Sequence, residues 1–289
     1  MSATATGLEL YTRTADDAAA AVINRYSTSF ALACRLLGPR PRPHVRNIYA
    51  LVRVADEIVD GPAHDAGLSP AQERATLDAL ENEVRDAIAS GFSANLVVHA
   101  FARTARECGI GDDLIAPFFA SMRTDLDTAA HDDASHDAYV YGSAEVVGLM
   151  CLQVFLNAGM SEPARPAADL VDGARRLGAA FQDVNFLRDL DDDATRLGRD
   201  YLDGAADDDR RTAVLDRIDA DLAAAAATVP FLPPDCRRAV TAAHDLFAEL
   251  SRRLRRTPAG APRVRVPDAV KATLAVRAFL GRPPKGAHA

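Results

Sequence analysis

The order of apolar and polar residues along the chain predicts a protein built of helices alone. Apolar residues recur at spacings of three and four almost throughout, whereas alternating segments bounded by Asn-Gly or Asp-Gly turns are missing. Glycine and proline mark the breaks, as at Gly38-Pro39 and Gly61-Pro62. We expect about ten helices, at residues 16–37, 45–60, 70–90, 94–108, 112–127, 138–158, 165–194, 207–227, 234–256 and 268–280.

The chain shows no internal repeat, low-complexity linker or shift in composition that would divide it. We therefore expect one all-α domain over residues 1–289, with flexible segments at residues 1–13 and 282–289. Alanine-rich stretches such as DLAAAAATV strengthen this prediction, because alanine loses no side-chain entropy in a helix.

Composition and charge narrow the class of function. A formal charge of -8 argues against general binding to nucleic acid, which needs a broad basic surface. The four cysteines are scattered without CxxC spacing, so a zinc site or a disulfide framework is not predicted and a reducing cytoplasm fits. The N-terminus lacks the basic start and apolar core of a signal peptide. The longest apolar run, residues 146–156, is shorter than the roughly 20 residues that cross a bilayer. We expect a soluble cytoplasmic protein, with contact to a membrane surface left open.

The first candidate site lies in the segment YALVRVADEIVD. Asp56 and Asp60 are four residues apart, so a helix presents both carboxylates on one face. Arg53 and Tyr49 lie one and two turns earlier on the same stripe. Apolar residues fill most of the other positions, which indicates that this helix is buried and that its acids need partners.

A second stripe follows in the segment FQDVNFLRDLDDDATRLGRDYL. Gln182, Asn185, Asp189 and Asp193 repeat over three helical turns. Carboxylate and amide oxygens suit Mg²⁺ or Mn²⁺ better than zinc, and Mg²⁺ commonly completes its coordination with phosphate oxygens. The pair of clusters therefore predicts a metal site for a diphosphate. The alternative for either cluster alone is a solvated helix face, the usual place for acids at this spacing.

Three arginines are candidates for the diphosphate oxygens. The guanidinium groups of Arg53, Arg188 and Arg199 match phosphate geometry. Each arginine is equally well explained by a salt bridge to a neighbouring acid, and the two roles can coexist.

Small residues mark a third segment, YVYGSAEVVGLM at residues 139–150. Gly142, Ser143, Ala144 and Gly148 stand among apolar residues at helical spacing. Such residues either allow two helices to approach closely or leave a groove for an apolar ligand, and close packing is the more frequent cause.

Together these blocks resemble the squalene and phytoene synthase family of trans-isoprenyl diphosphate synthases. The resemblance begins at YSTSFALA (residues 26–33), continues through the three segments above, covers nearly the whole chain and is greatest to bacterial phytoene synthases. It implies an isoprenoid-synthase-type helical bundle with a central apolar cavity. Asp56 and Asp60 then form the first aspartate-rich motif, and Asn185, Asp189 and Asp193 form the second.

The resemblance also implies roles for single residues. The residues expected to act in catalysis are Asp56, Asp60, Tyr139, Asp189 and Asp193, and the metal ligands are Asp56, Asp60, Asn185, Asp189 and Asp193. The residues expected to line the substrate site or bind diphosphate are Ser27, Ser29, Phe30, Tyr49, Arg53, Tyr139, Ala144, Gly148, Gln182, Asn185, Arg188, Arg199 and Tyr201.

Four positions depart from the pattern of the family. Thr28 stands where some relatives place a lysine that helps to bind diphosphate. Val140 and Glu145 replace a cysteine and a small residue, and Asp183 replaces an apolar residue after Gln182. Glu145 is either an added polar group near the cavity or a solvent-facing residue, and its spacing does not distinguish the two.

The activity implied by the resemblance is the joining of two prenyl diphosphates head to head through a cyclopropyl intermediate. We expect two geranylgeranyl diphosphates to give 15-cis-phytoene, a carotenoid precursor, with Mg²⁺ (or Mn²⁺) and without NADPH. The alternatives are a squalene or dehydrosqualene synthase that uses farnesyl diphosphate, and a non-catalytic helical scaffold that binds prenyl lipids.

The end of the chain, VKATLAVRAFLGRPPK at residues 270–285, is basic and apolar. Such a segment can lie on an anionic membrane surface, although a terminal helix packed on the bundle is the more frequent arrangement. Nucleic acid is not an expected partner, and the sequence does not indicate the oligomeric state.

Overall fold

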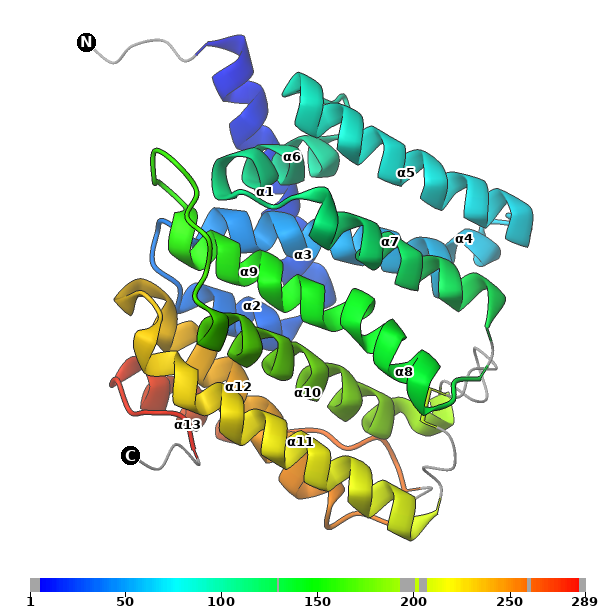
Figure 1. The fold of residues 1–289 in the computed structure, drawn as a ribbon, viewed down its shortest axis with the longest axis vertical. Coiled ribbons are helices and arrows are strands. Elements are labelled where there is room, and N and C mark those ends of the chain that lie inside the picture. The colour runs from blue at the N-terminus through cyan, green and yellow to red at the C-terminus, as the bar shows by residue number, and fades with distance from the viewer. Residues whose placement is uncertain (1–5, 129, 193–200, 203–206, 259–260, 286–289) are drawn as a thin grey trace.

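The computed structural model describes residues 6–128, 130–192, 201–202, 207–258 and 261–285. In these parts of the chain all regular structure is helical, which confirms the all-α prediction (Figure 1). The α-helices are α1 (Gly7–Tyr26), α2 (Thr28–Arg35), α3 (Arg42–Val59), α4 (Pro62–Asp65), α5 (Pro70–Ser90), α6 (Leu96–Cys108), α7 (Asp112–Asp127), α8 (Asp133–Val140), α9 (Val146–Asn157), α10 (Ala168–Asp192), α11 (Asp208–Thr228), α12 (Pro234–Leu254) and α13 (Asp268–Phe279).

The first expected helix differs most from the structure. It is two helices, because Ser27 has an extended backbone and its hydroxyl accepts a hydrogen bond from the Phe30 amide at 3.0 Å, which caps α2. The helix α1 also starts at Gly7, inside the stretch 1–13 for which the sequence predicts a flexible terminus. A capping box between Thr6 and Glu9 fixes this start.

The opposite end of the chain is bound to the bundle as far as the structure describes it. The Arg277 guanidinium donates to the Pro283 carbonyl at 2.6 Å, and the Lys285 amide donates to Asp245 Oδ1 at 2.8 Å. The predicted flexible segment 282–289 is thus attached at residues 283 and 285, and residues 286–289 lie outside the described residues. The helix α13 packs on α12, while membrane contact through this segment stays a prediction.

A long apolar helix crosses the middle of the molecule. The helices α8 and α9 join through a π-helical turn, η1 (Tyr141–Glu145), so that one helix runs from Asp133 to Asn157. This helix is long and apolar enough to cross a membrane. It packs between α7 and α10, however, and much of it is buried, as in the core helix of a globular protein.

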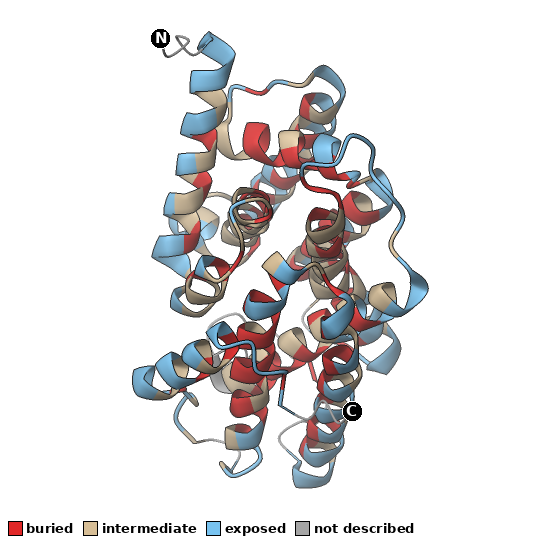
Figure 2. Cartoon of the chain, turned by 90° about the vertical axis from the view of Figure 1, so that its left-hand side faces the viewer, coloured by how far each residue is buried: buried red, intermediate tan, exposed pale blue. Residues whose placement is uncertain are grey.

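The helices form two packed groups on either side of this long helix (Figure 1). One apolar core joins α3, α5, α6 and α7 to α9. A second core joins α8 and α10 to α11 and α12. Figure 2 shows buried residues along the inward faces of the helices and exposed residues on their outer faces. These two cores are the largest of four apolar clusters among the described residues, and the long helix contributes to both.

Glycines bring this long helix close to α10. A Cβ atom on Gly148 would lie 2.5 Å from the Ala174 carbonyl oxygen, and one on Gly178 would lie 2.6 Å from the Ala144 carbonyl oxygen. Each glycine thus faces the backbone of the other helix. Close packing, the more frequent cause of such small-residue patterns, explains Gly148, although Ala144 and Gly148 also line a cavity.

We expect Gly148→Ala to lower the free energy of unfolding by about 1–3 kcal/mol, because the added methyl group meets a backbone oxygen that cannot rotate away. Urea unfolding followed by circular dichroism measures this loss. Gly7→Ala is the matched control, since a Cβ there would meet nothing within 4 Å. Equal stability of the wild type and Gly148→Ala would contradict the close approach of these helices.

Candidate active site

A large cavity lies between the two largest cores. It has a volume of about 1270 Å³ and is lined by residues from α2, α3, α9, α10 and α12, among other segments. This exceeds the roughly 300–1,000 Å³ of typical small-molecule sites. Its polar end contains Asp56, Asp60 and Asp189, and its remote end is lined by apolar residues such as Phe155 and Leu232.

The structure brings the predicted site residues of both clusters to this cavity. Asp193 and Arg199 lie outside the described residues, and their predicted roles stay predictions. Every other residue predicted for catalysis, metal or substrate lines the cavity: Ser27, Ser29, Phe30, Tyr49, Arg53, Asp56, Asp60, Tyr139, Ala144, Gly148, Gln182, Asn185, Arg188, Asp189 and Tyr201.

The first acidic cluster lies at the C-terminal end of α3. Burial and the negative charge of Asp60 raise the pKa of Asp56 well above its usual value, and Asp125 of α7 adds to this shift. Arg53 acts in the opposite direction. Negative charge is therefore concentrated at this end of the cavity, where a cation would be stabilised.

Arg53 forms a salt bridge to a neighbouring acid, which is one of the two roles that the sequence predicts for it. Its guanidinium contacts Glu57 one turn along α3 and stacks 4.5 Å from the centre of the Tyr26 ring. Burial lowers the pKa of Arg53, but the charges of Glu57 and Asp56 more than offset this and raise it. The side chain also lines the cavity, so it can reach a bound anion.

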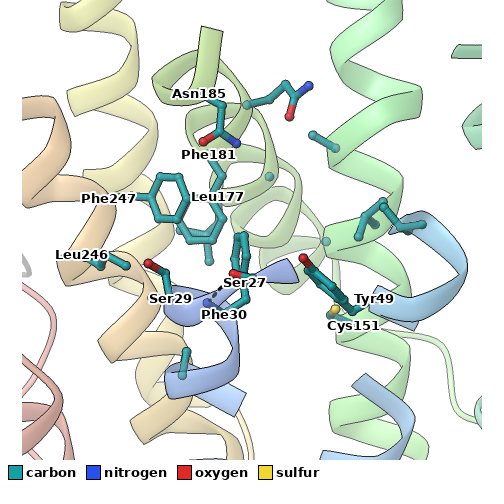
Figure 3. A pocket seen from close by; sticks show the side chains of 18 of the residues that line it. Ser27, Ser29, Phe30, Tyr49, Cys151, Leu177, Phe181, Asn185, Leu246 and Phe247 are labelled. Atoms are coloured by element: carbon teal, nitrogen blue, oxygen red, sulfur yellow. Dashed lines mark hydrogen bonds between the residues drawn. The ribbon is translucent and has the colours of Figure 1, made fainter. Parts of the chain in front are cut away.

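The second cluster is held by two arginines. Asp189 on α10 accepts from Arg188 at 3.0 and 2.6 Å, and from Arg263 at 2.5 and 3.0 Å. Burial alone would raise the pKa of Asp189, but these hydrogen bonds lower it below its usual value. Asn185 lies one turn earlier on the same helix and faces the cavity (Figure 3).

Sequence reasoning missed Arg263. It belongs to the connection between α12 and α13, where there is no helical periodicity to place it beside α10. The same connection brings Arg265 to the cavity, and α13 brings Lys271. Arg263, which contacts Asp189, thus adds a positive charge at the polar end that the two motifs do not indicate.

Asp125 is a second residue that the sequence did not reveal. The Tyr139 hydroxyl donates to its Oδ2 at 2.8 Å, and the Tyr201 hydroxyl donates to its Oδ1 at 2.7 Å. Burial, followed by the charge of Asp125, raises the pKa of Tyr139 well above its usual value. Tyr139 therefore stays a neutral hydrogen-bond donor at this end of the cavity. Asp125 stands at the end of α7 and belongs to neither motif, so only the tertiary structure reveals it.

The apolar part of the cavity contains aromatic rings (Figure 3). Phe181 and Phe247 stack with ring centres 3.8 Å apart, and Phe30 lies 6.1 and 5.8 Å from them. Tyr49 lies 6.2 Å from Phe30. Cys151 also lines this region, and burial raises the pKa of its thiol to about 12. These surroundings favour an apolar ligand.

Glu145, whose orientation the sequence left open, points away from the cavity. Its carboxylate accepts from Arg175 Nε at 2.6 Å, and Arg175 stacks 5.2 Å from the centre of the Tyr141 ring. It joins the π-helical turn to α10 and is not an added cavity group.

The residues at the polar end fit a hard divalent cation by their chemistry. Asp56, Asp60, Asn185 and Asp189 offer oxygen donors, and the raised pKa of Asp56 reflects charge that such a cation would offset. Among the described residues no group of three or more acidic, histidine or cysteine side chains is arranged as a ready metal site. Arg188 and Arg263 now occupy the oxygens of Asp189, so a metal there would have to displace them.

Comparison with known proteins identifies the family. The family model for squalene/phytoene synthase matches residues 23–204. The chain belongs to the squalene/phytoene synthase family. Members of this family are prenyltransferases, in agreement with the resemblance seen in the sequence.

Relatives in this family include phytoene synthases of bacteria and plants. The chain is 30% identical over 268 residues to a 15-cis-phytoene synthase of Paracoccus sp., an alignment that covers 84% of this chain and 83% of that protein. It is 34% identical over 187 residues to phytoene synthase 3 of Zea mays, covering 63% of this chain and 41% of that one. The chain thus matches less than half the length of the maize protein.

Solved structures share the fold. A dehydrosqualene synthase superposes with a TM-score of 0.77 at 21% identity, covering 94% of this chain and 98% of that chain. A squalene synthase from Alicyclobacillus acidocaldarius superposes with a TM-score of 0.73 at 19% identity, covering 86% and 95%. The isoprenoid-synthase-type bundle is therefore confirmed.

Proposed function

We propose that the chain joins two molecules of geranylgeranyl diphosphate head to head and forms 15-cis-phytoene and two diphosphates, a step in carotenoid biosynthesis. The observation that carries this proposal is the two-ended cavity, which has carboxylates and arginines at one end and an apolar remainder. Family membership and the names of the relatives support head-to-head prenyl condensation. The choice of a C20 substrate is our own inference.

The residues at the polar end suit the diphosphate groups. Guanidinium forks of Arg53, Arg188 and Arg263 match diphosphate oxygens. Asp56, Asp60, Asn185 and Asp189, with Asp193 outside the described residues, are the residues that would hold Mg²⁺ or Mn²⁺, and such a cation makes diphosphate a better leaving group. When Arg263 binds diphosphate, its guanidinium group leaves Asp189 and pairs with the diphosphate instead. The positive charge of Arg263 therefore stays balanced by an anion.

The remaining chemistry needs a dry cavity with electron-rich faces. Loss of the first diphosphate gives an allylic cation, and the double bond of the second substrate attacks it. Proton loss then closes the ring of a cyclopropyl diphosphate. Loss of the second diphosphate, rearrangement and a further proton loss give phytoene without any reductant. The ring faces of Phe30 and Tyr49 stabilise cations, and the surrounding helices exclude water.

The length of the cavity supports a long prenyl chain. Along α10 its lining runs from Asp189 to Leu170, which at 1.5 Å per residue is about 28 Å. Apolar residues such as Leu170, Leu177 and Phe181 line this path together with the small residues Gly173 and Ala174, which suits an apolar chain. The farnesyl alternative remains an explicit outcome of the test, because solved structures with this fold include dehydrosqualene and squalene synthases.

The decisive experiment is a product assay of the purified protein with Mg²⁺ and either geranylgeranyl or farnesyl diphosphate, each with and without NADPH. We expect a C40 hydrocarbon from the first substrate, independent of NADPH. A C30 product from farnesyl diphosphate alone would assign the chain to squalene or dehydrosqualene synthesis. No product and no diphosphate release from folded protein would indicate a non-catalytic prenyl-binding scaffold.

We expect Asp56→Asn and Asp189→Asn each to lower kcat at least about 100-fold, because metal-assisted charge stabilisation contributes several kcal/mol. The far-ultraviolet circular dichroism should stay unchanged. Asp219→Asn is the matched control, since this carboxylate contacts Ser251 and Arg255 and does not line the cavity. Full activity of either cavity variant, or an equal loss in the control, would refute a metal role for these aspartates.

We expect Cys151→Phe to discriminate between substrates by chain length. Cys151 stands twelve residues beyond Tyr139 on the same long helix, about 18 Å from the polar end, so a phenyl ring there shortens the apolar path. The ratio of kcat/KM for geranylgeranyl over farnesyl diphosphate should fall about 10–200-fold. Cys151→Ser keeps the volume and should leave the ratio unchanged. An equal loss with both substrates would mean that Cys151 does not limit chain length.

A further inference from the structure

A buried charged network lies behind the two cavity tyrosines. Asp183 of α10 is only 2% exposed, and it contacts His136 of α8 and Arg217 of α11. His136 Nε2 lies 3.0 Å from Asp183 Oδ1, and Arg217 Nη2 lies 2.9 Å from Asp183 Oδ2 and 3.1 Å from His136 Nε2. None of the three side chains lines the cavity. The proposed reaction therefore does not use them directly.

The network reaches the active site through the backbone of Tyr201. His136 Nδ1 lies 2.7 Å from the Tyr201 carbonyl oxygen. A carbonyl oxygen only accepts, so Nδ1 carries the proton and donates. The opposite nitrogen, Nε2, either donates to Asp183 Oδ1 or accepts from Arg217 Nη2, and in both cases the Asp183–Arg217 pair fixes the orientation of the imidazole ring. The position of the Tyr201 main chain thus depends, through His136 of α8, on the carboxylate of Asp183 in α10.

The side chain of Tyr201 connects this network to the cavity. Its ring stacks on Phe186 with centres 4.3 Å apart, and its hydroxyl donates to Asp125. Asp125 accepts from Tyr139 with its other oxygen. Because both oxygens of Asp125 are used, a displacement of Tyr201 would also change the hydrogen bond that orients Tyr139.

We propose that Asp183 is a positioning residue that acts through His136 to hold Tyr201, and with it the Tyr201–Asp125–Tyr139 array, at the polar end of the cavity. A buried charge network is a poor source of stability, since well-packed apolar residues of similar volume are often as stable or more stable. Stability alone therefore does not explain why charged residues occupy this buried position, whereas a role in placing Tyr139 and Tyr201 does. The kinetic part of this proposal rests on the proposed prenyl transfer, while the structural part does not.

The kinetic test compares Asp183→Asn and Asp183→Leu with the wild type. We expect kcat to fall about 10–100-fold, as for small displacements of catalytic groups, with KM nearly unchanged because the diphosphate ligands are untouched. In a double-mutant cycle with Tyr201→Phe, the second substitution should cost little further, because Asp183 acts through Tyr201. The proposal would be overturned if the fold-losses of kcat in the two single variants multiplied in the double variant, or if Asp183→Asn and Asp183→Leu left kcat unchanged.

A buried network of the same composition supplies the matched control. His244 Nδ1 lies 3.2 Å from Asp245 Oδ1, Arg277 contacts the other oxygen at 3.4 Å, and Asp245 is fully buried. Neither His244 nor Asp245 lines the cavity. Asp245→Asn should therefore change stability without the loss of kcat expected for Asp183→Asn. An equal loss of kcat in both would assign Asp183 a general structural role.

A spectroscopic measurement tests the proposal without any substrate. The chain has six tyrosines and no tryptophan, so its near-ultraviolet circular dichroism has no tryptophan contribution. Asp183→Leu should alter the tyrosine band, whereas Asp245→Asn should leave it as in the wild type. An unaltered band in folded Asp183→Leu would overturn the proposal. If the wild type turned over no prenyl diphosphate, the proposed function would fail, and this measurement alone would decide the role of Asp183.

Discussion

The burial of like charges at one end of an apolar cavity is the constraint that the rest of the site depends on. Carboxylates taken out of water are costly unless a cation balances them. At Asp56 this cost is visible as a raised pKa, caused by burial and by the neighbouring Asp60. At Asp189 two arginines balance the charge and the pKa is lowered. The two clusters thus face the same cavity in different electrostatic states: the negative charge near Asp56 is only partly balanced, whereas that of Asp189 is balanced by two arginines.

The packing of the helices makes this arrangement possible. Gly148 and Gly178 allow the long central helix and α10 to approach backbone to backbone, and small residues on the same helices leave space for the cavity beside the contact. The π-helical turn at Tyr141–Glu145 lies in this region, and such turns often occur at functional sites. One set of small residues therefore serves both close packing and the apolar path, so the two interpretations of the segment at residues 139–150 are not exclusive.

Much of the site was predictable because helical periodicity acts over short distances. Spacings of three and four residues place Asp56 with Asp60, and Asn185 with Asp189, without any knowledge of the fold. The resemblance to a family added Ser27, Tyr139 and Tyr201, which no spacing relates to either stripe. The apolar pattern continues across Ser27 and so does not predict the break there, which results from the extended backbone of Ser27 and its cap on the first turn of α2.

Contacts between distant segments were beyond this reasoning. Asp125 and Arg263 occur in no motif, and each becomes part of the site through partners that are 76 and 74 residues away in the chain. Asp183 stands out in the sequence, but its partners His136 and Arg217 are 47 and 34 residues away. A sequence shows which side chains share a helix face, whereas the cation that balances a buried acid depends on contacts made in the tertiary structure.

The division of the cavity into a charged end and an apolar part constrains how a prenyl diphosphate would lie in it. In the proposed reaction the diphosphate groups lie where the carboxylates and arginines converge, so the reacting carbon atoms, which are attached to diphosphate, would lie near Tyr139 and Tyr201, and the prenyl tails would extend toward Phe155 and Leu232. Tyr139 and Tyr201 both donate to Asp125, so the cavity carries two neutral hydroxyl groups beside its carboxylates. A neutral hydroxyl can orient a cationic intermediate without capturing it as a carboxylate would, which gives the two tyrosines and Asp125 a role at the polar end of the cavity in the proposed reaction.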